Sequence, residues 1–421
     1  MSAITAKASR KMKKYAVLTR EPRCFLGSFD FSWEQRKLGE LVDVCSGRDY
    51  KHLSEGTIPV YGTGGYMLSV NDALSYDRDA IGIGRKGTID RPYILKAPFW
   101  TVDTLFYAIP RENVDLNFAF DIFQNIDWKK KDESTGVPSL SKTAINDIDV
   151  LAPKHGEQQT IGQFFAAIDH LITLHQRKFE KLTNVKKSML EKMFPQNGSS
   201  YPEIRFKGFT DPWEQRKFSD VVATRRGLTY KPSDIRKNGV RVLRSSNIAE
   251  DSFVLSDEDV FVVREAVNID CVRANDILIT AANGSSRLVG KHTIISGIPE
   301  ESAVHGGFML LGTTKEPHFV NASMGSSWYR RFIELFVAGG NGAIGNLNKN
   351  DLDNQDIAIP SEKEQKKIGS FFRQLDNLIT LHQRKGKAAV TGCSNDANNS
   401  KGVYCKARDF GYNCCKKVEA P

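Results

Sequence analysis

Two separate stretches of the sequence gather arginine, lysine, asparagine, serine and tyrosine between short apolar runs. Arginine can form two hydrogen bonds with the edge of guanine, asparagine is the usual reader of adenine, and lysine neutralises phosphate. Residue types clustered in this way predict contacts with double-stranded DNA. The candidate DNA-binding residues are Arg85, Lys86, Thr88, Arg91, Tyr93, Lys129, Lys130 and Lys131 in the first half, and Arg225, Arg226, Tyr230, Lys231, Arg244, Ser246, Asn247, Asn283, Ser285 and Arg287 in the second. For any one of them a solvated loop is the alternative, and only the clustering favours readout.

The common motifs of enzymes and metal sites are absent from the sequence. The segment NGSSRLVGKHT resembles a phosphate-binding loop, but Gly284 and Gly290 enclose five residues instead of four, and His292 stands where Ser or Thr should hold magnesium. The seven cysteines form no C-x-x-C pair. An enzyme can lack these motifs, so their absence counts against an enzyme or a metal site without excluding either. The resemblance described below implies that this chain has no catalytic residue, no metal site and no bound cofactor of its own.

The composition is that of a globular protein with an excess of positive charge. The chain has 421 residues and a net charge of +9, which favours an acidic partner such as nucleic acid. A basic surface with no dedicated ligand is the alternative. No apolar run reaches the length of a membrane span, and the basic start contains no apolar stretch typical of a secretion signal. We expect a cytoplasmic protein.

The two halves of the sequence open and close with the same motifs, but the segments between those motifs, here called the middles, differ. WEQRK begins at Trp33 and again at Trp213, and residues 139–178 resemble residues 346–385, ending in the identical LITLHQRK. The opening copies are 180 positions apart and the closing copies 207, so the second half carries 27 extra residues. The middles show no visible match. A common frame suggests a common docking surface, and unlike contents suggest that two different things are read. Duplication followed by drift is the alternative.

Each half closes with a long amphipathic helix. Apolar residues recur at alternating steps of three and four through the proline-free run 157–193, and again from Ile368. Such a stripe predicts helices that pair with each other as an antiparallel coiled coil; a helix packed on its own domain is the alternative. His175 and His382 lie on the stripe and are interpreted as tolerated core residues. The predicted pairing residues are Ile161, Phe165, Ile168, Ile172, Leu182, Ile368, Phe372, Leu375 and Ile379.

Short β-branched and aromatic runs, separated by Gly, Asn, Asp and Pro, predict strands and turns in both middles. The expected fold class is mixed α/β, rich in sheet, in two pseudo-repeated halves that are each followed by a long helix.

The repeated motifs are specific. W-E-Q-R-K at a domain start, P-x-x-x-E-Q-x-x-I-G-x-F-F at 153–165 and 360–372, and L-I-T-L-H-Q-R-K occur twice in the same order. Together, over residues 33–385, they resemble the DNA-specificity subunit of type I restriction–modification systems. The resemblance implies two target recognition domains that each read one half of a bipartite DNA site, with the helices setting the gap. The domains expected are an extension at 1–32, recognition domain 1 at 33–155, spacer helix 1 at 156–194, a linker at 195–212, recognition domain 2 at 213–360, a truncated spacer helix 2 at 361–385, and a disordered tail at 386–421.

The resemblance also implies partners. Two methyltransferase subunits, which carry S-adenosylmethionine, would dock on the helices and frames, and restriction subunits, which use ATP and Mg²⁺, would join them. This chain would direct them to DNA without catalysing a reaction. A DNA-modifying enzyme that acts alone and a protein-only scaffold are the alternatives. The second half departs from the pattern after Lys385, where the heptad stops at Gly386.

Overall fold

The computed structural model describes residues 33–196, 198–250, 252–337 and 345–395. The chain divides into two compact units, of which the first contains the described residues up to Gln176 and the second contains Arg177–Gln383. The units are described separately. No helix among the described residues is both long and apolar enough to cross a membrane.

The repeated frame folds into the same small ladder in both units. In the first, β1 (Glu34–Lys37) pairs antiparallel with β9 (Asp149–Ala152), and Glu34 faces Ala152. In the second, β10 (Glu214–Lys217) pairs with β21 (Asp356–Ile359), and Glu214 faces Ile359. These partners are separated by the same 180 and 207 positions as the sequence repeats. The repeat in the sequence is therefore a repeat of strand pairing in identical register.

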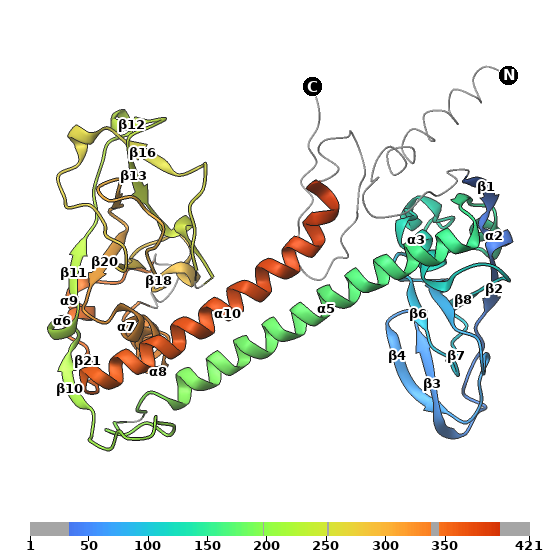
Figure 1. The fold of residues 1–421 in the computed structure, drawn as a ribbon, viewed down its shortest axis with the longest axis horizontal. Helices are drawn as coiled ribbons and strands as arrows, with labels where there is room; N and C mark the ends of the chain where they lie inside the picture. Colours follow the sequence, from blue (N-terminus) through green and yellow to red (C-terminus); the bar gives the residue numbers. More distant parts are fainter. Residues whose placement is uncertain (1–32, 197, 251, 338–344, 396–421) are drawn as a thin grey trace. The chain divides into compact units, whose positions relative to one another are not determined.

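The first recognition domain contains two sheets (Figure 1). A four-stranded antiparallel sheet has the order β2 (Val42–Ser46), β8 (Leu105–Pro110), β5 (Ala80–Gly84) and β6 (Tyr93–Leu95). A smaller sheet has the order β4 (Gly65–Val70), β3 (Glu55–Gly62) and β7 (Trp100–Thr101), with β3 parallel to β7. All five residues of β5 are buried, as expected of a short apolar central strand. The helices are α2 (Leu38–Leu41), α3 (Leu116–Asn125) and α4 (Lys142–Asn146).

The second recognition domain has the same plan. Its antiparallel sheet has the order β11 (Ala223–Arg226), β20 (Met309–Thr313), β17 (Ile277–Thr280) and β18 (His292–Ile294). A second sheet has the order β12 (Ile235–Arg236), β16 (Val260–Val262), β13 (Val240–Leu243) and β19 (Ala303–His305), with β13 parallel to β19. A ribbon of β14 (Ile248–Ala249) and β15 (Ser252–Phe253) is added. The helices are α6 (Phe218–Val221), α7 (Pro317–Met324), α8 (Ser327–Phe336) and α9 (Lys349–Asp353).

The two middles thus share a topology that their sequences do not reveal. Strands β2, β8, β5 and β6 correspond in order and direction to β11, β20, β17 and β18. The parallel pair of β3 and β7 likewise corresponds to β13 and β19. The expected mixed α/β fold in two pseudo-repeated halves is confirmed, and the likeness extends beyond the frames into the domains.

Each half ends in a long helix with a regular stripe. Helix α5 spans His155–Lys192 and α10 spans Glu362–Asn395. Along α5 the less exposed positions recur at alternating steps of four and three, which is the heptad spacing. Of the predicted pairing residues, Ile368, Phe372 and Leu375 are buried, and Ile161, Phe165, Ile168, Ile172, Leu182 and Ile379 are half-buried.

Within the second unit the end of α5 lies against α10. Lys186 Nζ is 2.9 Å from Asp376 Oδ1, and the ring centroids of Phe194 and Phe372 are 6.0 Å apart. Residue numbers rise along α5 as they fall along α10, so these segments run antiparallel. Pairing along the remainder of the two helices stays a prediction.

The predicted end of the second helix at residue 385 is wrong, because α10 continues to Asn395. One glycine, Gly386, weakens a helix by only about 1 kcal/mol relative to alanine, and the following Lys387, Ala388 and Ala389 favour helix. The predicted extension at 1–32 and the tail from 396 lie outside the described residues.

Candidate nucleic-acid interface

The first domain presents a basic loop immediately after its central strand β5. The backbone N–H groups of Arg85 and Lys86 donate to the Thr104 carbonyl over 2.8 and 3.4 Å, and Arg85 O accepts from Leu140 N over 2.9 Å. The side chains of Arg85, Lys86 and Thr88 are exposed. The backbone of this loop is therefore held while its side chains remain available to a ligand.

A second basic segment, the 3₁₀ turn Trp128–Lys131, lies beside this loop. Lys129 Nζ is 2.9 Å from Asp90 Oδ2, and this hydrogen bond lowers the pKa of the Asp90 carboxyl. The turn is anchored by buried Trp128, whose indole donates to Phe123 O over 2.7 Å. The structure therefore brings together, on one surface, seven predicted residues that are all exposed: Arg85, Lys86, Thr88, Arg91, Lys129, Lys130 and Lys131.

Tyr93, also predicted to bind DNA, has a structural role instead. Its hydroxyl donates to Gly62 O over 2.6 Å, and its ring lies 6.1 Å from that of Tyr61 between centroids. Burial raises the pKa of Tyr93 well above its ordinary value. The residue holds β6 against β3.

In the second domain two predicted loops meet. Asn283 Nδ2 donates to Ser245 Oγ over 2.8 Å, and Asn283 Oδ1 accepts from Ser285 N over 2.9 Å. Ser246, Ser285 and Arg287 are exposed on these loops, and Arg244 is half-buried. A polar surface therefore forms where the loops after β13 and β17 converge.

The third predicted segment of the second domain begins in β11, with Arg225 and Arg226, and continues beyond it. Leu228 N donates to His305 O over 2.7 Å, which ties the segment to the end of β19. Arg226 and Lys231 are exposed, and Tyr230 packs on a small apolar cluster. The Arg225 guanidinium lies 3.3 Å from Asp270 and 3.7 Å from Asp276, so its charge is already compensated within the domain.

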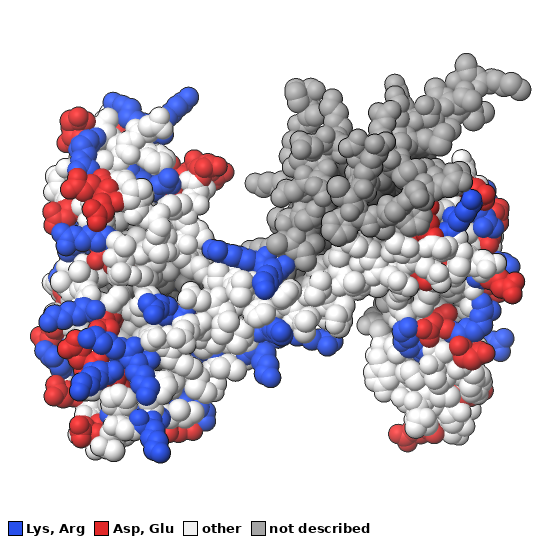
Figure 2. All heavy atoms as spheres, in the orientation of Figure 1, with Lys and Arg blue, Asp and Glu red and all other residues white. Residues whose placement is uncertain are grey.

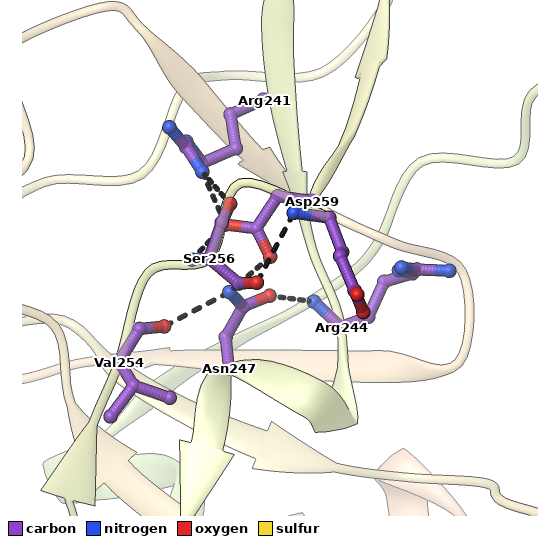
Figure 3. Close-up of polar contacts among 7 residues, drawn as sticks. Arg241, Arg244, Asn247, Val254, Ser256 and Asp259 are labelled. Atoms are coloured by element: carbon purple, nitrogen blue, oxygen red, sulfur yellow. Dashed lines mark hydrogen bonds and ion pairs between the residues drawn. The ribbon is translucent and has the colours of Figure 1, made fainter. Parts of the chain in front are cut away.

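The prediction that Asn247 reads a base is wrong. Its side chain is completely buried, and all its hydrogen bonds are used within the domain. The amide donates to Val254 O over 3.0 Å and to Asp259 Oδ1 over 2.9 Å, and its oxygen accepts from Arg244 N over 2.8 Å (Figure 3). Asp259 also pairs with Arg241. Asn247 therefore organises the segment between β13 and β16, and both of its amide hydrogens are donated within the domain.

The two sites are equivalent at the level of the backbone. In the first domain Val102 N donates to Tyr61 O over 3.0 Å. The equivalent bond of the second domain runs from Gly306 N to Leu243 O over 2.8 Å. Thr104 O accepts from Arg85 N and Lys86 N in the loop after β5. In the same way, Phe308 O accepts from Ala281 N and Ala282 N over 2.9 and 3.0 Å. Consequently Arg85 and Lys86 occupy the positions of Ala281 and Ala282.

Sequence reasoning missed several residues of these sites. Asp103 and Thr104 lie at the first site, where their carbonyl oxygens accept from Arg85, and Gly307 and Phe308 lie at the second, where Phe308 O accepts from Ala281 N and Ala282 N. One signal was available, since Gly47 and Gly227 are 180 positions apart, like the frames. A Cβ on either glycine would lie 2.0 Å from a carbonyl oxygen, of Val102 and Gly306 respectively, so both mark the same close backbone crossing.

Figure 2 shows how charge is distributed on one face of the molecule. Over the second unit, basic atoms gather in several places and alternate with acidic ones, whereas the surface over β3 and β4 of the first unit is mostly uncharged. Tyr66 and Met67 of β4 are 63% and 49% exposed there. On the face shown, the surface over β3 and β4 therefore offers few charges to a ligand.

Comparison with known proteins agrees with this arrangement. A family model described as "Type I restriction modification DNA specificity domain" matches residues 32–184 and 210–391. The chain is 23% identical over 274 residues to "Type I restriction enzyme MjaVIII specificity subunit" of Methanocaldococcus jannaschii, covering 62% of this chain and 63% of that protein. It is 23% identical over 265 residues to "Putative type I restriction enzyme MjaX specificity subunit" of the same organism, covering 60% and 58%. The chain spans about three-fifths of the length of these relatives.

Among solved structures, the chain resembles the crystal structure of a type I restriction-modification system S subunit from M. genitalium. The TM-score is 0.62 at 12% sequence identity, covering 88% of this chain and 96% of that one, which shows a shared fold. Each segment matched by the family model begins just before a frame strand and ends within a long helix. The chain belongs to the family of the type I restriction modification DNA specificity domain.

Proposed function

We propose that this chain is the DNA-reading subunit of a type I restriction–modification complex and recognises a bipartite site, one half-site for each recognition domain. The observation that carries the proposal is the equivalence of the two loop sites, which share a backbone and differ in side chains. After the central strand the first domain has Arg85 and Lys86, whereas the second has Ala281, Ala282 and Asn283. Two readers of one design with different chemistry fit two different half-sites.

The separation of the half-sites follows, in this proposal, from the helices. The heptad stripe of α5 and the antiparallel contacts near Lys186 and Asp376 support pairing of α5 with α10 along their length. A paired helix resists bending, so it would hold the two readers at a constant spacing. The DNA between the half-sites would then be spanned without being read.

Partner subunits would dock on a repeated apolar patch of the helices. Leu171 and Leu174 are 48% and 36% exposed on α5, and their counterparts Leu378 and Leu381 are 46% and 43% exposed on α10. Large apolar side chains left exposed outside a helix stripe indicate an interaction surface. Two equivalent patches fit two copies of a methyltransferase subunit that carries S-adenosylmethionine. Restriction subunits that use ATP and Mg²⁺ would complete the assembly.

In this proposal the chain contributes recognition and no catalytic residue. The test is a methylation map of genomic DNA from cells that contain the methyltransferase subunits with and without this chain. Methylation at one bipartite motif, only when the chain is present, is the expected result. Binding of the complex to that motif should weaken steeply with salt, in proportion to the phosphates contacted. Methyl transfer by the purified chain alone, or no DNA binding at low salt, would contradict the proposal.

A further inference from the structure

Phe308 is an exposed aromatic residue in the middle of the second reading site. It lies in the turn between β19 and β20, and 75% of its surface is exposed, the largest value among the large apolar residues that the structure describes. Burial of a phenylalanine side chain is favourable, so leaving one in water forgoes stability that the fold would otherwise gain. Such a residue is explained when a ligand covers it.

The turn that carries Phe308 is rigid. The Phe308 carbonyl accepts hydrogen bonds from Ala281 N and Ala282 N, and Met309 N donates to Gly306 O over 2.8 Å. Gly306 N donates in turn to Leu243 O over 2.8 Å. The backbone on both sides of Phe308 is thus tied to the strands β13 and β17, and the ring is presented from a defined position.

The surroundings of Phe308 are polar, which argues against a patch for docking a protein. The residues bonded to its turn lead directly into the loops that carry Ser245 and Asn283, which are joined by a hydrogen bond of 2.8 Å. On the other side, a Cβ on Gly307 would lie 3.2 Å from Thr229 Oγ1. One apolar ring among hydroxyl and amide groups suits a surface that reads bases. The major groove of DNA presents polar base edges next to thymine methyl groups, so a reader needs both polar and apolar side chains.

The first domain has no such ring at the equivalent place. Thr104 occupies the position of Phe308, and its carbonyl accepts the corresponding hydrogen bonds from Arg85 N and Lys86 N. The first site therefore combines a hydroxyl with two cations, whereas the second combines a phenyl ring with two alanines. Cationic side chains suit the acceptors of guanine and the phosphates, whereas a phenyl ring suits an apolar group.

We propose that Phe308 is a specificity-determining residue of the second domain and contacts the 5-methyl group of a thymine in its half-site. The inference rests on the proposed function and adds the base pair that this domain selects. Apolar contact with the thymine methyl group is a recognised way of distinguishing an A·T pair in the major groove.

The experiment uses the full chain assembled with its methyltransferase subunits and duplexes that contain the mapped site. Each thymine is replaced in turn by uracil, which removes only the methyl group. The wild-type complex should lose roughly fourfold in affinity at one position of one half-site, as expected for a single buried methyl group. Phe308→Ala should bind the thymine and uracil duplexes equally, and Phe308→Leu should keep part of the discrimination.

Thr104→Ala is the matched control, because it alters the equivalent position of the other domain and should leave this discrimination intact. Phe308 is exposed, so unchanged thermal unfolding of Phe308→Ala is expected and checks that the fold is preserved. Discrimination retained by Phe308→Ala, a half-site of G·C pairs alone, or a loss of affinity with no thymine dependence would overturn the inference. Each of these outcomes leaves sequence-specific binding intact, whereas a wild-type complex that binds no specific DNA would overturn the proposed function as well.

Discussion

Arg205 donates two hydrogen bonds of 2.8 Å to Glu364, from Nε and Nη2 to the two carboxylate oxygens. The equivalent carboxylate of the first half, Glu157, instead accepts from the Trp33 indole over 3.0 Å. Trp213, the counterpart of Trp33, is buried, and its indole N–H finds no hydrogen-bond partner among the described residues. The same helix-start motif is thus anchored by an ion pair in one half and by a neutral donor in the other.

This difference predicts unequal effects of one substitution made in both halves. Glu364→Gln leaves a largely buried guanidinium without its counter-charge, which typically costs about 3 kcal/mol or more. Glu157→Gln keeps an oxygen that can accept from the indole and should cost about 1 kcal/mol or less. Hydrogen exchange at the starts of α10 and α5 measures both effects in the full chain. Equal losses in the two halves would contradict the role given to Arg205.

Asn247→Ala should destabilise the second domain. The substitution removes three hydrogen bonds and leaves Asp259 and the Arg244 N–H with unmet bonding capacity, so a loss of about 3 kcal/mol is expected. Hydrogen exchange in β13 and β16 reports the change. Ser246→Ala, at the exposed neighbour, is the control and should have almost no effect on stability. If Asn247→Ala instead changed the base preference of a stably folded domain, the structural role would be refuted.

Arg85→Ala should relax recognition of one half-site and leave the other intact. The loss of a bidentate contact with a guanine should reduce discrimination at one base pair by about 1–3 kcal/mol. Selection of bound duplexes from a randomised library, with the assembled complex, measures the preference at every position. Lys130→Ala is the comparison, because a phosphate contact should weaken all sequences alike. Equal relaxation of both half-sites would rule out this role for Arg85.

The second domain should lose stability between pH 6.5 and pH 4. Burial lowers the pKa of His305 from 6.5 to about 4, so in this window the unfolded chain binds a proton that the folded domain does not. The stability contributed by neutral His305 is complete above pH 6.5 and falls as the pH drops toward 4, by roughly 3 kcal/mol in total. The slope of unfolding free energy against pH should flatten in His305→Gln.

Replacing one apolar patch should remove one partner copy. Leu171→Ser with Leu174→Ser, or Leu378→Ser with Leu381→Ser, places hydroxyls where a partner would bury leucine, which should weaken that contact by several kcal/mol. Native mass spectrometry of the complex should then show one methyltransferase subunit instead of two. Thr173→Ala, on the same exposed turn, is the control. Two subunits retained in both double variants would exclude these leucines as the docking surface.

The frame, the long helices and the fold class could be predicted because they depend on local patterns. Three patterns can be recognised directly in the sequence: WEQRK, the heptad spacing and the repeated Pro-x-x-x-Glu-Gln. Each has a direct structural counterpart. The shared topology of the two middles was not predictable in this way. It depends on backbone hydrogen bonds, such as those to Thr104 O and Phe308 O, which place few demands on side chains.

The errors at the site have physical causes. Asparagine is the usual reader of adenine, but its amide also satisfies buried polar groups, and only the fold distinguishes these two uses at Asn247. Phe308 lies in an apolar run, and its 75% exposure is set by the turn between β19 and β20, which the sequence alone does not reveal. The ion pairs of Arg225 with Asp270 and Asp276 likewise join residues some 50 positions apart, so the sequence does not reveal them; its contact with DNA stays a prediction.

The ladder of β1 with β9, and its copy of β10 with β21, has a consequence for how new specificities arise. Each domain begins with one strand of this ladder and ends with the other, so the chain enters and leaves the domain at the same place. The segment between the two strands is therefore bounded by one pair of neighbouring strands. Loops can lengthen, as the 27 additional residues of the second half illustrate, without shifting the register of that pair. Under the proposed function, a change in the loops that read one half-site would leave the frames and helices that bind partner subunits unaltered, so one half-site could evolve independently of the other.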